Sequence, residues 1–454
     1  MKLWRPLVAR LLILALIPAM SEYSTVAPAT VVGDIDGARF QVQVPYPWNR
    51  TLLLFSHGYQ RLGSGSSDVP ADAPDPVSQQ WLLDHGYALA ASGYSQQGWA
   101  VEQAFHDQLA LLDRFGSLGF GRPARVVAWG DSMGGLITTG LVQLHPGRFA
   151  GGLPMCGVVA GASGMWNQLL DAEFVFKTLL APAPSLRLVG IGDPTANFRL
   201  ASSLLKAAQG TAQGRARLAL AATVADVPGW YDAEDARPAA SDYAGRELSQ
   251  FTWDARLDFY FGFFLRQELE QRAGGNPSWN TGVDYGRQLD LSADRGEVEA
   301  LYRAAGLDLT SDLQTLALTP RVAADPVALR YLETYFRADG HIRVPVLTVH
   351  TTGDGLVLPD DELAYANAVR AAGDDALPRQ AFVDRAGHCT FTPSETLTAV
   401  LTLIGRLDTG RWGPTGPIAM NAVAEALHIG PAAFIVFKPT DVLRLVEHGK
   451  LGRS

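Results

Sequence analysis

The chain has 454 residues, of which 47% are hydrophobic and 18% are charged, so it can bury a large core and still accommodate an inserted segment. Its 46 acidic residues outnumber its 37 lysines and arginines, which gives a formal net charge of −9. This balance argues against a nucleic acid as partner, because a nucleic-acid surface needs clustered basic residues.

The N-terminus has the organisation of a secretory signal peptide. Basic residues precede the short apolar run Leu11–Ile17, and small residues of the kind found at cleavage sites follow as far as Ala29. The run is too short for a stable membrane-spanning helix, and no other stretch is long enough. We therefore expect a signal peptide over residues 1–29 and a secreted or periplasmic mature protein without a stable membrane anchor. An uncleaved helix near the membrane is the alternative.

Residues 30–156 alternate between short apolar strands and helices with apolar residues at helical spacing. After an edge strand or hairpin in residues 30–50, the predicted strands are Thr51–Phe55, Tyr87–Ser92, Ala124–Ala128 and Ala150–Met155, and the predicted helices are Val77–His85, Val101–Phe115 and Leu136–His145. This rhythm predicts an α/β fold with a doubly wound, mostly parallel sheet. Functional sites in such sheets lie at the carboxyl ends of the strands.

A candidate nucleophile lies between one of these strands and the next helix. The sequence Gly130-Asp131-Ser132-Met133-Gly134 matches G-x-S-x-G in a strand–turn–helix context, which is a nucleophile elbow. The turn is so sharp that side chains at both glycines would collide with the neighbouring strand and helix, and it exposes the Ser132 hydroxyl. The alternative is a glycine-rich turn whose serine only caps the helix.

Residues 157–342 are rich in helices and aromatic residues and lack a clear sheet element, so we expect a helical cap inserted into the core. Long helical stretches are predicted at Met165–Leu180 and Leu200–Val224. Most of the aromatic residues should form the core of the cap, and Trp166 is a candidate to line the substrate pocket.

The sheet resumes in residues 343–407, the second half of the core. The predicted strands are Val344–His350 and Ala381–Val383, and the predicted helices are Asp360–Ala372 and Pro393–Leu407. Residues 408–454 form a C-terminal extension of unknown role, in which a helix is predicted at Ile418–Leu427 and a short strand at Ala433–Phe437.

A serine nucleophile needs a base, and the base needs a carboxylate that holds its tautomer. His388 is the best candidate base because it follows the last of these strands, whereas its strongest rival, His350, lies in or at the end of a strand. Asp354 lies just past a strand end in a Gly-Asp-Gly turn. Asp384 is so near His388 in sequence that it could hardly reach around to the imidazole, so we prefer Asp354.

The order Ser132…Asp354…His388 is that of the α/β-hydrolases. On the motifs His57-Gly58, Gly130–Gly134, Gly353-Asp354 and Gly387-His388, the chain resembles secreted serine esterases and lipases of this superfamily that carry a large helical cap. The resemblance covers about residues 50–156 and 343–407. It implies an oxyanion hole formed by the backbone N–H groups of Tyr59 and Met133, with His57 as a structural hydrogen-bonding residue.

The two cysteines are Cys156 and Cys389, which fit one disulfide bond in an oxidising compartment; two buried free thiols are the alternative. No H-E-x-x-H or paired-cysteine motif occurs, so we expect no metal site. No dinucleotide-binding fingerprint occurs either, and the expected mechanism needs no cofactor.

These features predict hydrolysis of carboxylic esters, either small molecules or polymers, through an acyl-enzyme on Ser132. Other acyl chemistry on the same triad is the first alternative, namely a peptidase or aminopeptidase, a thioesterase, a polyester depolymerase or an acyltransferase. The second is a binding protein on the hydrolase fold that has lost catalysis. The acyl and alcohol specificity and the oligomeric state stay open.

Overall fold

The computed structural model describes residues 26–63, 69–335 and 337–445, and its strands form one sheet of order β1-β2-β4-β3-β5-β6-β7-β8-β9. The strands are β1 (Ala29–Ile35), β2 (Ala38–Val44), β3 (Thr51–Ser56), β4 (Ala88–Ser92), β5 (Arg125–Asp131), β6 (Gly151–Met155), β7 (Val346–Gly353), β8 (Pro378–Ala386) and β9 (Phe434–Ile435). Strands β3 to β8 pair in parallel, whereas β1 and β2 at one edge and β9 at the other are antiparallel. The predicted α/β-hydrolase fold is confirmed.

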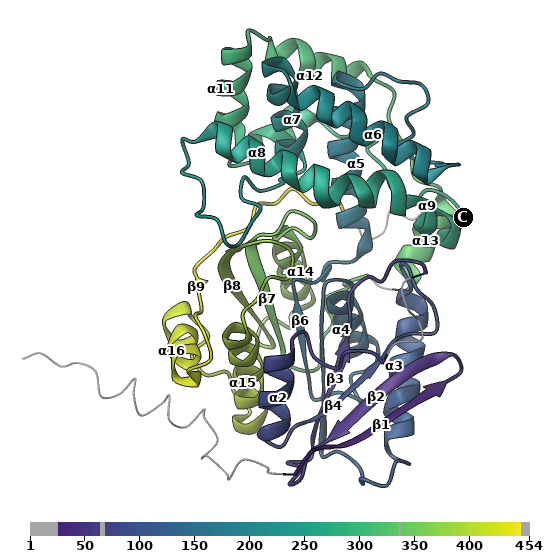
Figure 1. The fold of residues 1–454 in the computed structure, drawn as a ribbon, viewed down its shortest axis with the longest axis vertical. Coiled ribbons are helices and arrows are strands. Elements are labelled where there is room, and N and C mark those ends of the chain that lie inside the picture. The colour runs from purple at the N-terminus through teal and green to yellow at the C-terminus, as the bar shows by residue number, and fades with distance from the viewer. Residues whose placement is uncertain (1–25, 64–68, 336, 446–454) are drawn as a thin grey trace, which may run out of the picture.

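Helices cover both faces of the sheet (Figure 1). The core helices are α2 (Pro76–Asp84), α3 (Val101–Phe115), α4 (Met133–Leu144), α14 (Asp360–Ala372), α15 (Pro393–Thr409) and α16 (Pro417–Leu427). Because successive strand residues point to opposite faces, Leu52 and Leu54 pack with α3, α4 and α14, whereas Leu53 and Phe55 pack with α2, α15 and α16. A strand that is buried on both faces reads as a continuous apolar run, which is why β3 was recognisable in the sequence.

Between β6 and β7 the chain forms a helical insertion, which lies above the sheet in Figure 1. Its helices are α5 (Ala162–Leu179), α6 (Pro194–Gln209), α7 (Ala212–Val224), α8 (Tyr243–Trp253), α9 (Arg266–Ala273), α10 (Tyr285–Leu291), α11 (Arg295–Ala305), α12 (Leu309–Leu318) and α13 (Pro326–Tyr335), with π-helical turns η1 (Asp254–Asp258) and η2 (Phe261–Leu265) between α8 and α9. A separate cluster of buried apolar residues, including Phe176, Leu218 and Phe259, forms its core.

One helical prediction in the insertion is corrected. The continuous stretch Leu200–Val224 is divided at Gly210 and Thr211 into α6 and α7. The Thr211 side chain accepts a hydrogen bond from the N–H of Gly214 at 2.9 Å, so this residue starts a new helix instead of continuing the old one.

The C-terminal extension ties the core to the insertion. Helix α16 packs on α15, and β9 extends the sheet beside β8, after which the yellow segment of Figure 1 runs upward. In that segment the Thr440 hydroxyl contacts Asp226 of the insertion and Asp360 of α14. Arg444 forms an ion pair with Asp171 on α5. These contacts give a structural role to residues whose role the sequence left open.

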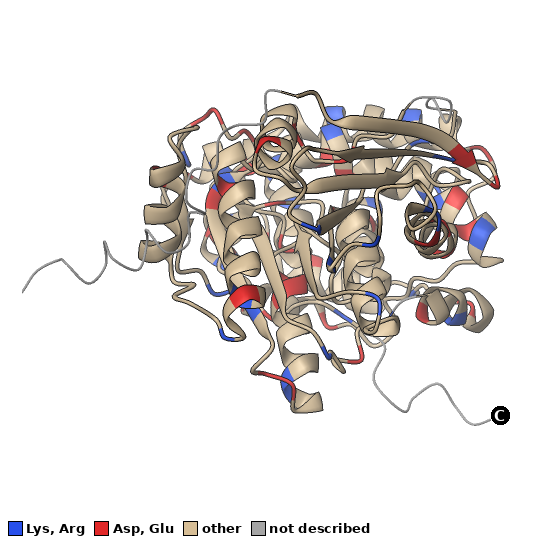
Figure 2. Ribbon diagram, turned by 90° about the horizontal axis from the view of Figure 1, so that it is seen from below, with Lys and Arg blue, Asp and Glu red and all other residues tan. Residues whose placement is uncertain are grey.

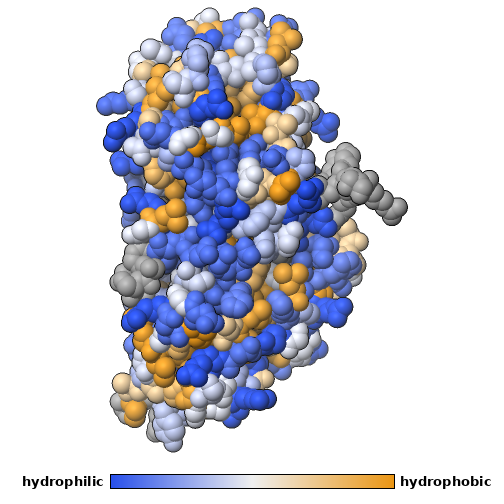
Figure 3. Space-filling model, turned by 90° about the vertical axis from the view of Figure 1, so that its right-hand side faces the viewer, coloured by the Kyte–Doolittle hydropathy of each residue, from blue (hydrophilic) through white to orange (hydrophobic). Residues whose placement is uncertain are grey.

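The surface carries mixed charge. Acidic and basic residues are interspersed in Figure 2, and the face in Figure 3 is mostly hydrophilic with small separate hydrophobic patches. In the part of the chain that the structure describes, no helix is long and apolar enough to cross a membrane. The predicted signal peptide, residues 1–29, lies outside the described residues except for its last four positions.

Candidate active site

The nucleophile elbow has the predicted geometry. Ser132 stands between β5 and α4 with φ of 55°, a backbone conformation that is strained for a residue with a Cβ. A Cβ at Gly130 or Gly134 would overlap the carbonyl oxygen of Ser56 on β3, so only glycine fits these positions. The Ser132 side chain makes no capping hydrogen bond to α4, which disagrees with the alternative of a simple helix cap.

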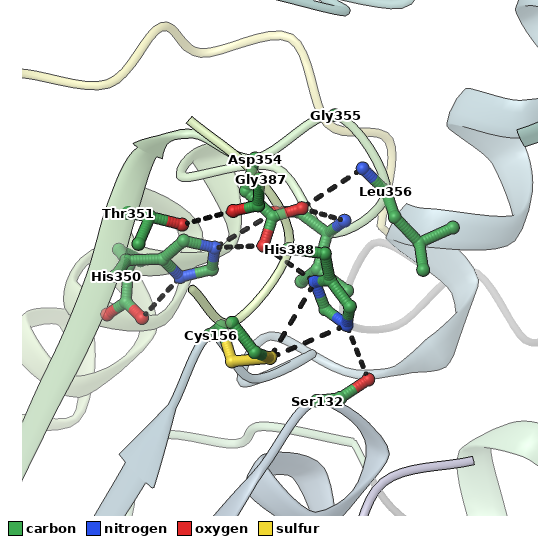
Figure 4. Close-up of polar contacts among 12 residues, drawn as sticks. Ser132, Cys156, His350, Thr351, Asp354, Gly355, Leu356, Gly387 and His388 are labelled. Atoms are coloured by element: carbon green, nitrogen blue, oxygen red, sulfur yellow. Dashed lines mark hydrogen bonds and ion pairs between the residues drawn. A yellow bond between two sulfur atoms is a disulfide. The ribbon is translucent and has the colours of Figure 1, made fainter. Parts of the chain in front are cut away.

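His388 and Asp354 complete a hydrogen-bonded chain with Ser132 (Figure 4). Nε2 of His388 lies 2.8 Å from the Ser132 hydroxyl, and Nδ1 lies 2.7 Å from Oδ2 of Asp354. The elbow follows β5, Asp354 follows β7 and His388 follows β8, so three parallel strands deliver these residues to one edge of the sheet. The arrangement is that of a nucleophile, a base and an orienting carboxylate.

Hydrogen bonds from the backbone and the influence of nearby histidines together favour the ionised form of Asp354. The side chain is fully buried, and its Oδ1 accepts hydrogen bonds from the N–H groups of Leu356 and Val357 at 3.1 Å each. Burial opposes ionisation, but the charge of His388 and hydrogen bonds from His350 and His388 outweigh it and lower the pKa of the Asp354 carboxyl.

The rival residues lie elsewhere. Asp384 points to Arg237, with which it forms an ion pair of 2.9 Å. His350 is fully buried on the far side of Asp354 from His388, and its ring bonds to Glu362 and to the carbonyl of Val357. The His57 ring stacks on a tyrosine at 4.0 Å between centroids, and its Nδ1 lies 2.7 Å from the carbonyl oxygen of Gly58, as suits a structural residue.

The loop after β3 runs beside the nucleophile. A Cβ at Gly58 would lie 3.2 Å from the Cβ of Ser132, and Met133 is the first residue of α4. Tyr59 follows Gly58 and packs its ring against Phe261 of η2, with 5.5 Å between ring centroids. These positions suit the predicted oxyanion hole of Tyr59 and Met133 amides, which stays a prediction.

The predicted disulfide between Cys156 and Cys389 is present and joins residues 233 apart in sequence. It connects the end of β6 to the loop that carries His388, and the Cys389 sulfur lies 3.5 Å from Nε2 of His388. Both cysteines have positive φ, as has Gly387, so the loop holds a tight and unusual conformation. Across the described ranges, Cys156, His388 and Cys389 are the sole group placed closely enough to hold a metal ion, but the disulfide occupies both sulfurs.

The end of α8 and the π-helical turn η2 contact the loops that follow β7 and β3. A Cβ at Gly355, next to Asp354, would lie 2.6 Å from the ring of Trp253 at the end of α8. Trp166 is buried near Phe261 of η2 and packs edge-to-face against Trp99, with 5.4 Å between ring centroids. Its predicted contact with substrate stays a prediction, because the structure places the ring in the packing between insertion and core.

The insertion contains three buried carboxyl groups that the sequence did not reveal. Glu173 lies on α5, and Asp254 and Asp258 lie on η1; all three are at most 2% exposed. Among the described residues their oxygens have no hydrogen-bond partner, although Oε2 of Glu173 forms an ion pair of 3.5 Å with Arg266. Burial raises the pKa of Glu173 to about 8, and burial together with the neighbouring carboxylates raises the pKa values of Asp254 and Asp258 far above their usual range. Isolated acidic residues in amphipathic helices resemble solvent-facing ones, so no signal distinguished them.

Comparison with known proteins extends the assignment. The model of the prolyl oligopeptidase family matches residues 84–177, a segment that contains the elbow. The o-phthalyl amidase of Xanthobacter agilis is 30% identical over 448 residues, which cover 91% of this chain and 95% of that protein. The chain belongs to the o-phthalyl amidase family. It is a serine hydrolase, and amide chemistry fits the comparisons better than the ester chemistry expected first from the sequence.

The solved structures that this chain resembles are distant from it in sequence. The acylaminoacyl peptidase of Pyrococcus horikoshii is 10% identical with a TM-score of 0.39, covering 88% of this chain and 44% of that one. The chain therefore spans less than half the length of that peptidase. Est1E from Butyrivibrio proteoclasticus is 13% identical with a TM-score of 0.35, covering 88% of this chain and 98% of that one.

Proposed function

We propose that the protein is a serine amidase that hydrolyses the amide bond between an aromatic acyl group and an amine. The observation that carries the proposal is the continuous hydrogen-bonded chain from the Ser132 hydroxyl through His388 to Asp354. The choice of an amide is supported by the relationship to o-phthalyl amidase over nearly the whole length of both chains.

In the proposed reaction, Ser132 attacks the amide carbonyl carbon while Nε2 of His388 takes its proton. The N–H groups of Tyr59 and Met133 stabilise the oxyanion, each donor contributing about 3 kcal/mol to lowering the barrier. An amine leaves poorly as an anion, so His388 must return the proton to the amide nitrogen before the C–N bond breaks. Water then attacks the acyl-enzyme with His388 again as base, and the products are a carboxylic acid and a free amine.

Aromatic side chains at the active-site loops support an aromatic acyl group. Tyr59, in the loop after β3, packs against Phe261 of the insertion, and Trp253 of the insertion packs against Gly355 in the loop after β7. Such rings favour flat apolar groups through edge-to-face and stacked contacts. We propose that the insertion supplies this specificity.

The experiment compares substrates that differ either in the leaving group or in the acyl group. The purified protein is assayed with the anilide, the phenyl ester and the phenyl thioester of benzoic acid, and with the anilide of 2-carboxybenzoic acid. Aminoacyl anilides extend the panel to peptidase chemistry, and Ser132→Ala is the control. We expect hydrolysis of the aromatic anilides that the control lacks. Hydrolysis of the esters with no turnover of any amide would contradict the amidase proposal and favour the ester hydrolase predicted first from the sequence.

We also propose that the protein is exported. The signal-like N-terminus and the disulfide between Cys156 and Cys389 support this location, because structural disulfides persist in oxidising compartments. N-terminal sequencing of the mature protein tests it, and a chain that starts at Met1 in the cytoplasmic fraction would contradict it.

A further inference from the structure

His350 lies inside β7, directly behind the candidate triad, and its side chain is fully buried. Both ring nitrogens have close partners: Nε2 lies 2.9 Å from the carbonyl oxygen of Val357, and Nδ1 lies 3.1 Å from Oε1 of Glu362. Figure 4 shows the ring on the opposite side of Asp354 from His388. The proposed amide hydrolysis does not use this histidine.

The partners of the ring determine its protonation. A carbonyl oxygen can only accept a hydrogen bond, so Nε2 of His350 must carry a proton. Glu362 also acts as an acceptor, because its Oε2 accepts a hydrogen bond from the side-chain amide of Gln380 at 2.9 Å and contacts the Thr348 hydroxyl. An ionised Glu362 requires a proton on Nδ1 as well, and a ring that donates from both nitrogens is a cation.

The His350 ring stands next to the acid of the triad. Nε2 of His350 is 3.6 Å from Oδ2 of Asp354, and the same oxygen accepts the Nδ1–H of His388 at 2.7 Å. One carboxylate oxygen thus lies between two imidazoles, one of which faces the nucleophile and one of which faces the protein core.

We propose that His350 is a positioning residue of the triad, a buried imidazolium that keeps Asp354 ionised and fixed and thereby sets the pH at which His388 accepts a proton. The inference rests on the triad of the proposed amidase. It differs from a structural role for His350, because a residue that only fills space would change stability or turnover without changing the pH dependence of turnover.

The charged groups around His350 agree with this role. Burial alone would lower the pKa of His350, but the hydrogen bonds and charges of Asp354 and Glu362 raise it to about 10. Burial raises the pKa of the neighbouring Asp361 to about 8, so this carboxyl is protonated at neutral pH. Burial, together with the charges of Asp254 and Asp354, also raises the pKa of Asp258 on η1, which disfavours a second negative charge beside Asp354.

Removal of the positive charge on His350 should therefore shift the pH dependence of turnover in a predictable direction. Without a positive charge near Asp354, the carboxylate attracts the proton of His388 more strongly, and His388 stays protonated to a higher pH. The acidic limb of the kcat/KM profile should move upward by roughly 1.5 to 2 pH units, the scale of one charge about 7 Å away acting through an effective dielectric constant near 20.

The test compares His350→Gln with the matched variant His145→Gln, whose histidine ends α4 away from the triad. For each protein, kcat/KM on the best substrate is measured between pH 5 and 9 and divided by the fraction of sites that a fluorophosphonate labels. We expect the limb to move upward in His350→Gln only. An unmoved limb in a folded, fully labelled His350→Gln protein would overturn the proposal.

A second measurement needs neither turnover nor a folded variant. In the wild-type protein labelled with 15N-histidine, NMR distinguishes a neutral ring from a doubly protonated one. We expect one histidine that is protonated on both nitrogens and does not titrate between pH 5 and 9. If every histidine is neutral at pH 9, the proposal is wrong. Failure of the amidase proposal would appear separately, as an inactive wild-type protein whose NMR result still stands.

Discussion

Reduction of the disulfide between Cys156 and Cys389 should lower amide hydrolysis before it unfolds the core. The bond attaches the loop of His388 to the end of β6, and its sulfur lies 3.5 Å from the imidazole. Residues 387 and 389 have positive φ, so the free loop has little reason to keep this conformation. A base displaced by a fraction of an ångström loses much of its effect.

The magnitude follows from the length of chain that the bond closes. For a separation of 233 residues, the chain-entropy model gives about 5 kcal/mol of stabilisation, an upper value because native strain subtracts from it. This loss is large beside the roughly 5–15 kcal/mol that stabilise a typical protein, so the midpoint of urea unfolding should fall clearly.

The assay first establishes the bond and then breaks it. Mass spectrometry of the non-reduced, alkylated protein should find no alkylated cysteine. Cys156→Ser then breaks the bond and leaves Cys389 beside His388, and kcat/KM is compared at urea concentrations below the unfolding transition. We expect lower kcat/KM while tryptophan fluorescence still reports a folded core. Two alkylated cysteines would refute the bond, and unchanged kcat/KM in Cys156→Ser would refute the role assigned to it.

Three further predictions concern the elbow, the acid and the insertion. Asp354→Asn should reduce kcat by about 10⁴-fold, because asparagine favours the wrong tautomer of His388, whereas Asp384→Asn should have little effect. If steady-state kinetics show the larger loss of kcat in Asp384→Asn, the wrong acid was chosen. Gly134→Ala should abolish fluorophosphonate labelling, because its Cβ overlaps the Ser56 carbonyl, and normal labelling would count against the steric demand for glycine at the elbow. Trp166→Ala should destabilise the protein by about 3–5 kcal/mol in urea unfolding and change the ratio of benzoyl to acetyl anilide hydrolysis; an unchanged ratio would place the acyl pocket elsewhere.

Much of the core could be predicted because its signals are local. The strand β3 is a continuous apolar run, α3 has an apolar stripe, and the glycines around Ser132 follow from the steric demands of one turn. The triad residues could be chosen because each follows a predicted strand, because parallel strands end at one edge of the sheet, and because their order matches that of the α/β-hydrolases.

What the sequence could not reveal depends on contacts between distant segments. His350 was recognised as a rival base, but its partnership with Glu362 and Asp354 exists only once β7 and α14 pack together. The burial of Asp254 on a π-helical turn likewise depends on the whole insertion. The contact of Thr440 with Asp226 joins residues 214 apart, which no local pattern indicates.

The central claim, that Ser132 forms an acyl-enzyme from an aromatic amide, is tested most directly by trapping that intermediate. The protein is mixed with the anilide of 2-carboxybenzoic acid or benzoic acid, quenched in acid within the first turnover and digested for mass spectrometry. The account predicts that the peptide containing Ser132 gains the mass of the acyl group, and that Ser132→Ala gains none. Release of aniline with no acylated Ser132 peptide, or equal release by Ser132→Ala, would contradict it.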